Sequence, residues 1–232
     1  MAGFLRFLFG VLLLPACWGV CRAFVHALAA SSGGFTVGTL SLLGGVLVFV
    51  FVWLALPRPV RTYVLGHELT HALWGLLFGA MPSDLRVSES GGSVRLSKSN
   101  VLITLAPYFF PFYTFLVIVA ALVTYAFIRP LPAIPLWLFM IGFTWAFHVL
   151  FTIETLSHAQ PDIRLYGRLF SWTFIFIVNV LIVLVWLACT TDLTFAALGG
   201  FLAQDVLAAY VGVGRALWNA GRSLVNLLSS HT

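Results

Sequence analysis

Long apolar stretches alternate along the chain with short breaks rich in proline, arginine or small polar residues. Each of six stretches is long enough to cross a bilayer as a helix, because about 20 apolar residues cover the hydrocarbon core. Proline and charged residues between the stretches set their boundaries, and a loop is expected at residues 31–34. The pattern therefore predicts about six transmembrane helices, within residues 4–30, 38–56, 62–80, 100–128, 134–157 and 168–190.

Residues 84–98 follow a different pattern, with apolar and polar positions alternating around Gly91 and Gly92. A period of two with glycines at its centre is typical of a β-hairpin. Lipid cannot satisfy the free edge of a hairpin, so we expect it at the membrane interface or against the helix bundle.

The last segment, residues 193–229, is less apolar than the others. Arg215, Asn219, Arg222 and Asn226 recur at helical spacing and form one polar stripe. This is typical of an amphipathic helix that lies in the membrane interface. The predicted fold is an all-α polytopic membrane protein of about six transmembrane helices, with a small β-hairpin and this C-terminal helix, in a single domain over residues 1–232.

Composition supports membrane insertion. The chain is 61% hydrophobic and 8% charged, with a mean hydropathy of +1.06, whereas soluble domains carry roughly 25% charged residues. The net charge of +5 comes mostly from residues between apolar stretches, where anionic lipid headgroups are sufficient partners. We therefore expect the lipid bilayer as a partner and no nucleic acid, and no sequence feature sets an oligomeric state.

Three polar residues interrupt the third apolar stretch, namely His67, Glu68 and His71. Residues four apart share one face of a helix, so both imidazoles can bind one metal ion with Glu68 beside them. The pattern is the His-Glu-x-x-His signature of a zinc hydrolase. Random placement of this chain's histidines and glutamates gives about 0.002 occurrences.

A catalytic zinc site needs a third protein ligand and an open position for water. Glu154 and Asp162 are the acidic residues available in or between the later apolar segments. Asp162 is preferred, because Pro161 before it breaks the helix and can turn the short carboxylate inward. Glu154 remains the alternative, which would give a site of two histidines and a glutamate.

The order of these features resembles the site-2 protease family of intramembrane zinc metalloproteases. The resemblance rests on His67 to His71, the hairpin at 84–98, Leu105-Ala106-Pro107 and Gln160-Pro161-Asp162, and covers about residues 60–175. Ile163 stands where the family has glycine, Gln160 is the amide nearest to the family's asparagine, and no peptide-binding domain is inserted.

The resemblance implies an enzyme that hydrolyses peptide bonds of membrane-spanning or membrane-bound protein substrates. It implies Zn²⁺ held by His67, His71 and Asp162, with Glu68 as the catalytic base that activates the zinc-bound water. It also implies a catalytic core at about 60–175, in a multi-pass protein of the bacterial inner membrane.

Several other interpretations of these residues are compatible with the sequence. His148, Glu154 and His158 can contribute to the site by orienting a ligand or stabilising an oxyanion, or can be packing and interfacial residues. A non-enzymatic membrane protein that binds metal or serves as a scaffold is the alternative from a different functional class.

Overall fold

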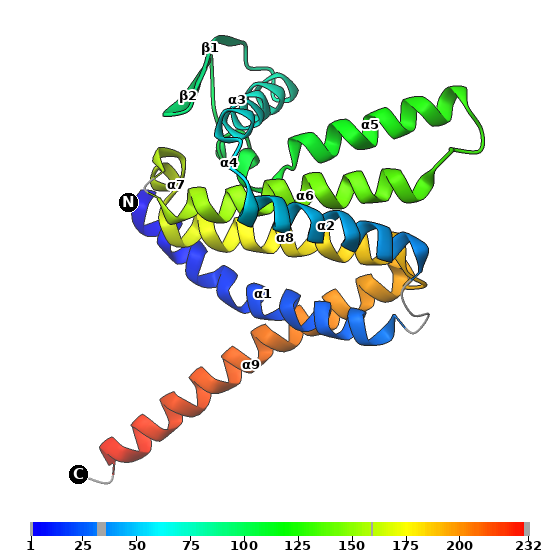
Figure 1. Ribbon diagram of the computed structural model, residues 1–232. Helices are drawn as coiled ribbons and strands as arrows, with labels where there is room; N and C mark the ends of the chain where they lie inside the picture. Colours follow the sequence, from blue (N-terminus) through cyan, green and yellow to red (C-terminus); the bar gives the residue numbers. More distant parts are fainter. Residues whose placement is uncertain (1, 32–35, 159, 230–232) are drawn as a thin grey trace. The chain divides into compact units, whose positions relative to one another are not determined.

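The computed structural model describes residues 2–31, 36–158 and 160–229, so most of the predicted loop at 31–34 lies outside the described residues. Nine helices and a two-stranded antiparallel sheet are described (Figure 1). In chain order they are α1 (Ala2–Ala30), α2 (Val37–Ala55), α3 (Val60–Leu77), β1 (Pro82–Ser88), β2 (Gly91–Leu96), α4 (Val101–Phe109), α5 (Phe112–Phe127), α6 (Ile134–Ser157), α7 (Pro161–Tyr166), α8 (Arg168–Thr190) and α9 (Phe195–Ser229).

Within the described residues, five helices are long and apolar enough to cross a membrane, namely α1, α2, α6, α8 and α9. The bent pair α4 and α5 makes a sixth if it is one broken span. Many large apolar side chains on these helices are exposed, as expected of surfaces that face lipid. The chain is therefore an integral membrane protein.

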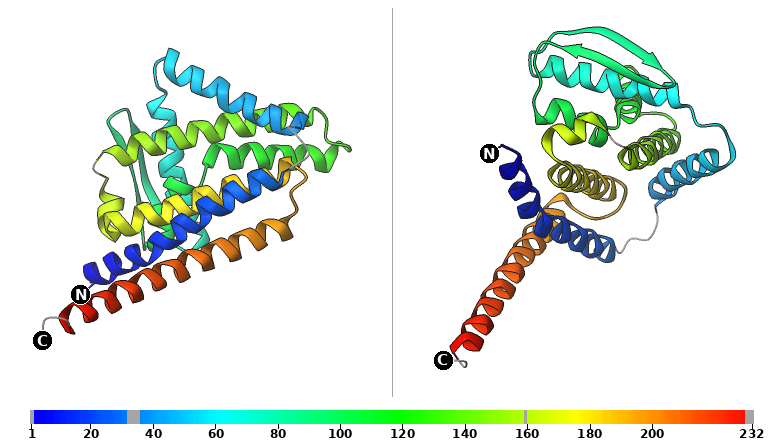
Figure 2. Two further views of the ribbon diagram at one scale, coloured as in Figure 1. Left: turned by 90° about the horizontal axis from the view of Figure 1, so that it is seen from below. Right: turned by 90° about the vertical axis from the view of Figure 1, so that its left-hand side faces the viewer.

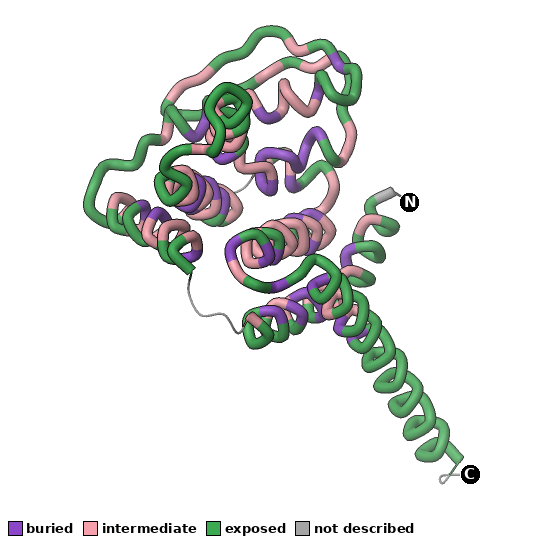
Figure 3. Tube along the Cα trace, turned by 90° about the vertical axis from the view of Figure 1, so that its right-hand side faces the viewer, coloured by how far each residue is buried: buried purple, intermediate pink, exposed green. Residues whose placement is uncertain are grey.

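Two segments differ from the sequence prediction of which helices cross the membrane. Helix α3 forms as expected but is not among the five, because Arg61, Glu68 and two histidines lower its mean hydropathy. Helix α9 is among them, since its first half contains a sufficiently apolar window. Residues 211–229 are exposed throughout (Figure 3), and their placement in the membrane interface stays a prediction.

The sequence predicts that Pro107 and Pro111 bend the segment 100–128 or end a half-helix within it, and this break is confirmed. Helix α4 ends at Phe109, and α5 leaves it at an angle of 79°. Pro111 cannot donate a backbone hydrogen bond and holds Phe110 in an extended conformation, which stops the first helix. Pro107, by contrast, is accommodated inside α4.

The predicted hairpin is also confirmed, but its turn does not lie at Gly91 and Gly92 as the sequence pattern suggests. Ser88 pairs with Gly91, so Glu89 and Ser90 form the turn and both glycines belong to β2. The Ser88 hydroxyl donates a hydrogen bond to the Gly91 carbonyl and stabilises this turn. The hairpin packs along α3 (Figure 2).

The chain divides into two compact units, while the single domain over residues 1–232 stays a prediction. One comprises Met1–Gly34 and Leu169–Thr232, and the other is Phe35–Arg168. The first unit packs α1 against α9, where the carboxylate of the buried Asp205 pairs with Arg22 and His26. The second unit contains nearly all of the predicted catalytic core.

Helices α2 and α6 cross closely within the second unit. A β-carbon on Gly45 would lie 2.0 Å from the Phe139 carbonyl oxygen, and one on Gly142 would lie 2.0 Å from the Leu42 carbonyl oxygen. Glycine at both positions allows this backbone contact, as is common between membrane helices. The aromatic core beside it, built on Phe49, joins α2 and α6 to α3 and so fixes the helix that carries the histidines.

Candidate metal centre

Helix α3 presents His67 and His71 on one face. They are one turn apart, and their ring centroids are separated by 5.0 Å. The preceding turn of the same helix contributes Tyr63 and Val64 to the core of the unit. This packing fixes the rotation of α3 about its axis and therefore the direction of both imidazoles.

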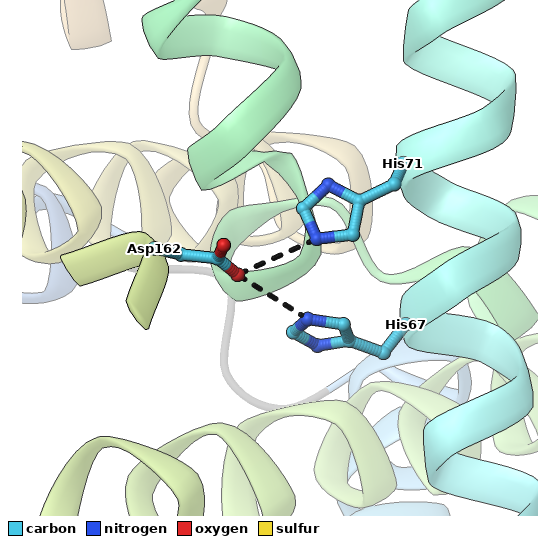
Figure 4. A group of neighbouring side chains, drawn as sticks. All are labelled: His67, His71 and Asp162. Atoms are coloured by element: carbon cyan, nitrogen blue, oxygen red, sulfur yellow. Dashed lines mark ion pairs between the residues drawn. The ribbon is translucent and has the colours of Figure 1, made fainter. Parts of the chain in front are cut away.

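Asp162 reaches the two histidines from a separate helix of the same unit. Helix α6 ends at Ser157, Pro161 begins α7, and Asp162 lies in the first turn of this short helix. Its Oδ2 lies 3.6 Å from His67 Nε2 and 3.4 Å from His71 Nε2 (Figure 4). The three residues that the sequence predicts as ligands are therefore neighbours in the fold.

The dimensions and chemistry of this cluster fit a zinc ion. Its three potential ligand atoms all lie within 4.8 Å of one another. Ligand atoms at about 2.0–2.1 Å from a tetrahedral zinc ion are about 3.3 Å apart, close to the two separations found here. Two imidazole nitrogens and one carboxylate oxygen also form a donor set that zinc accepts in catalytic sites, with a fourth position left for water.

Each of the three side chains also has a partner outside the cluster. The Nδ1 of His71 lies 2.9 Å from the Ile103 carbonyl oxygen, to which it can only donate, so its Nε2 keeps a lone pair for a metal. The Tyr63 hydroxyl lies 3.5 Å from His67 Nδ1. The buried Tyr108 donates a hydrogen bond of 3.1 Å to Asp162 Oδ2. These contacts hold the donor atoms toward a common point.

Asp162 is charged in this setting. Burial by itself raises the pKa of its carboxyl, but the neighbouring His67 and His71 outweigh burial and lower the pKa well below its usual range. The ionised carboxylate is the form that binds a divalent cation.

Glu68 lies beside the cluster and is not one of its members. Its side chain is 7% exposed and borders a cavity of about 510 Å³. His67 also lines this cavity, together with the hairpin turn and the end of α6. Glu68 is therefore an acidic side chain that borders the cavity without belonging to the candidate ligand cluster.

Glu154 is engaged elsewhere. It lines the same cavity, but its carboxylate forms an ion pair with Arg58, whose guanidinium also lies over the ring of Trp53. Of the two candidate third ligands, the fold thus brings Asp162 to the histidines.

The two further histidines that the sequence offers for the site, His148 and His158, have different surroundings. His158 is exposed, and its Nδ1 lies 2.8 Å from the Glu154 carbonyl oxygen at the end of α6. His148 is buried, and its Nε2 has no hydrogen-bond partner among the described residues. His148 and His67 line a second cavity of about 10 Å³, room for about one water molecule. Neither His148 nor His158 belongs to the ligand cluster.

Sequence reasoning did not identify the supporting residues. Tyr63 precedes His67 by four positions, a spacing that points to the same helix face. Tyr108 follows the Leu105-Ala106-Pro107 segment directly, which is a weaker signal. The Ile103 carbonyl has no signal in the sequence, because every residue carries one.

Comparison of the chain with protein-family models, curated proteins and solved structures found no match.

Proposed function

We propose that this protein is an intramembrane zinc metalloprotease that hydrolyses peptide bonds of membrane-spanning or membrane-bound protein substrates. The observation that carries the proposal is the cluster of His67, His71 and Asp162, with Glu68 beside it on a large cavity. Its setting among helices able to cross a membrane supports a substrate that is itself in the bilayer. The resemblance to site-2 proteases favours the inner membrane of a bacterial cell.

The residues of the cluster divide the chemistry between them. His67, His71 and Asp162 would hold the metal, which supplies Lewis acidity toward a water molecule and toward the scissile carbonyl. Glu68 accepts the proton of the attacking water on its carboxylate and then delivers it to the leaving amine. Because Glu68 is outside the ligand cluster, its carboxylate does not have to hold the metal as well as transfer protons.

The position of the hairpin supports a role for it in binding the substrate. A peptide must be extended to be cleaved, and an extended backbone can hydrogen-bond to an unpaired strand edge. The hairpin turn lines the same cavity as His67 and Glu68, and much of β1 is exposed. A substrate segment bound in this cavity would therefore lie next to the proposed base.

Zinc content tests the ligand set. We expect about one zinc ion per chain in the purified wild-type protein, and a large loss in His67→Ala and in Asp162→Ala. Glu154→Ala is the matched control, since it removes a carboxylate that borders the same cavity but pairs with Arg58. A folded wild-type protein that takes up no zinc would refute the proposal.

A proteolysis assay distinguishes the hypothesis of an enzyme from that of a metal-binding scaffold. The wild type and Glu68→Gln are reconstituted in liposomes with a set of single-span membrane proteins, and cleavage products are identified by mass spectrometry. The enzyme reading requires products from the wild type and their loss in Glu68→Gln at unchanged zinc content. Identical product patterns for the wild type and Glu68→Gln would contradict the enzyme hypothesis and favour a metal-binding scaffold.

A further inference from the structure

Strand β2 lies directly against the proposed base. A β-carbon built on Gly92 would lie 2.6 Å from Val64 Cγ1, 2.7 Å from Glu68 Cγ and 2.9 Å from Glu68 Oε1. Real side chains do not approach this closely, so only glycine lets the strand come this near to α3. The three heavy atoms nearest to this position all belong to the two α3 side chains.

The same strand also brings a backbone donor to the carboxylate. The backbone N–H of Val94, two residues after Gly92, faces the Glu68 side chain and favours its charged form. A glutamate on a helix otherwise has three side-chain torsions with which to move its carboxylate. Here contact with Gly92 limits the aliphatic part of the side chain, and a hydrogen bond from the Val94 N–H would fix its end.

We propose that strand β2 is the positioning element for the base, with Gly92 permitting the close approach and the Val94 N–H fixing the Glu68 carboxylate. This inference rests on the proposed function for its catalytic consequence. Gly92 and Val94 act through Glu68, so they are positioning residues. The hairpin thereby has a role in catalysis besides any contact that it makes with substrate.

The size of the effect follows from the geometry. Adding one methyl group at Gly92 requires contacts of 2.6–2.9 Å to open to at least 3.4 Å, the start of ordinary van der Waals contact. Either β2 withdraws or the Glu68 side chain moves, by roughly 0.5–1 Å in both cases. A misplacement of about 1 Å at a reacting group can lower the rate about 100-fold.

The first experiment compares Gly92→Ala with the wild type on whichever single-span substrate the wild type cleaves. We expect kcat to fall about 10- to 100-fold, with a smaller change in KM and unchanged zinc content. Gly44→Ala in α2 is the matched control, because its added methyl group meets its nearest neighbour, the Phe139 ring, at 3.8 Å. Wild-type kcat in Gly92→Ala, or a loss of activity explained by lost zinc, would overturn the inference.

The second experiment needs no cleavage. Amide hydrogen exchange at Val94 is measured in the full-length wild type, Glu68→Gln and Glu68→Ala, with the Arg95 amide as the internal reference. We expect Val94 to exchange at least about tenfold faster in Glu68→Ala, and at a rate nearer to wild type in Glu68→Gln, whose side-chain oxygen still accepts a hydrogen bond. Equal Val94 exchange in all three proteins would overturn the inference. Because this readout is independent of proteolysis, it also holds if the proposed function fails.

Discussion

Tyr108→Phe tests whether the partners behind the ligands prepare the site for metal. The substitution removes one hydroxyl, which donates a hydrogen bond of 3.1 Å to Asp162 Oδ2. The ring itself is fully buried and packs edge-on against His67, with centroids 5.3 Å apart. Phenylalanine keeps this packing, so the variant isolates the hydrogen bond.

Two effects of the hydroxyl oppose each other. It withdraws charge from Oδ2, which by itself weakens that oxygen as a ligand, and it holds the carboxylate in the direction of the histidines. Partners of metal ligands typically change metal affinity 10- to 100-fold when they are removed. Since Asp162 is a short residue on a six-residue helix, we expect orientation to dominate and zinc to bind about 10- to 100-fold more weakly. This corresponds to about 1.4–2.8 kcal/mol.

Competition with a chelator of known zinc affinity measures this change in the purified protein. Tyr210→Phe is the matched control, because it removes a tyrosine hydroxyl that donates a hydrogen bond of 2.7 Å to the Leu12 carbonyl oxygen in the other compact unit. We expect this control to bind zinc as the wild type does. Equal or tighter zinc binding by Tyr108→Phe would refute the argument that this hydrogen bond orients the ligand.

Three further predictions follow from the same geometry. Glu68→Gln should retain zinc and lose about 10²- to 10⁴-fold in cleavage rate, measured by product formation in liposomes. Asp162→Ala should lower zinc content in elemental analysis while Glu154→Ala leaves it unchanged, and the reverse result would identify Glu154 as the ligand. Gly142→Ala should destabilise the α2–α6 contact by about 1–3 kcal/mol, measured by thermal unfolding in detergent, because the added β-carbon meets a carbonyl oxygen at 2.0 Å. Gly44→Ala, whose added methyl group meets the Phe139 ring at an ordinary van der Waals distance of 3.8 Å, should leave the unfolding temperature unchanged.

The amino-acid sequence by itself determined the local features of this protein. Apolar stretches predicted the long helices, the alternation around Gly92 predicted a hairpin, and Pro111 marked the break between α4 and α5. The spacing of His67 and His71 placed them on one helix face. All of these depend on residues within a few positions of each other, so the chain's own periodicity is sufficient to show them.

Tertiary structure decided which distant groups meet. The sequence offered Glu154 and Asp162 as candidate third ligands and favoured Asp162 because of Pro161, but only the fold shows Glu154 paired with Arg58 and Asp162 beside the histidines. Tyr108 behind Asp162 and the approach of Gly92 to α3 are likewise contacts between separate elements. Such contacts depend on how helices and strands pack in three dimensions, and the residues nearby in the chain carry no record of that packing.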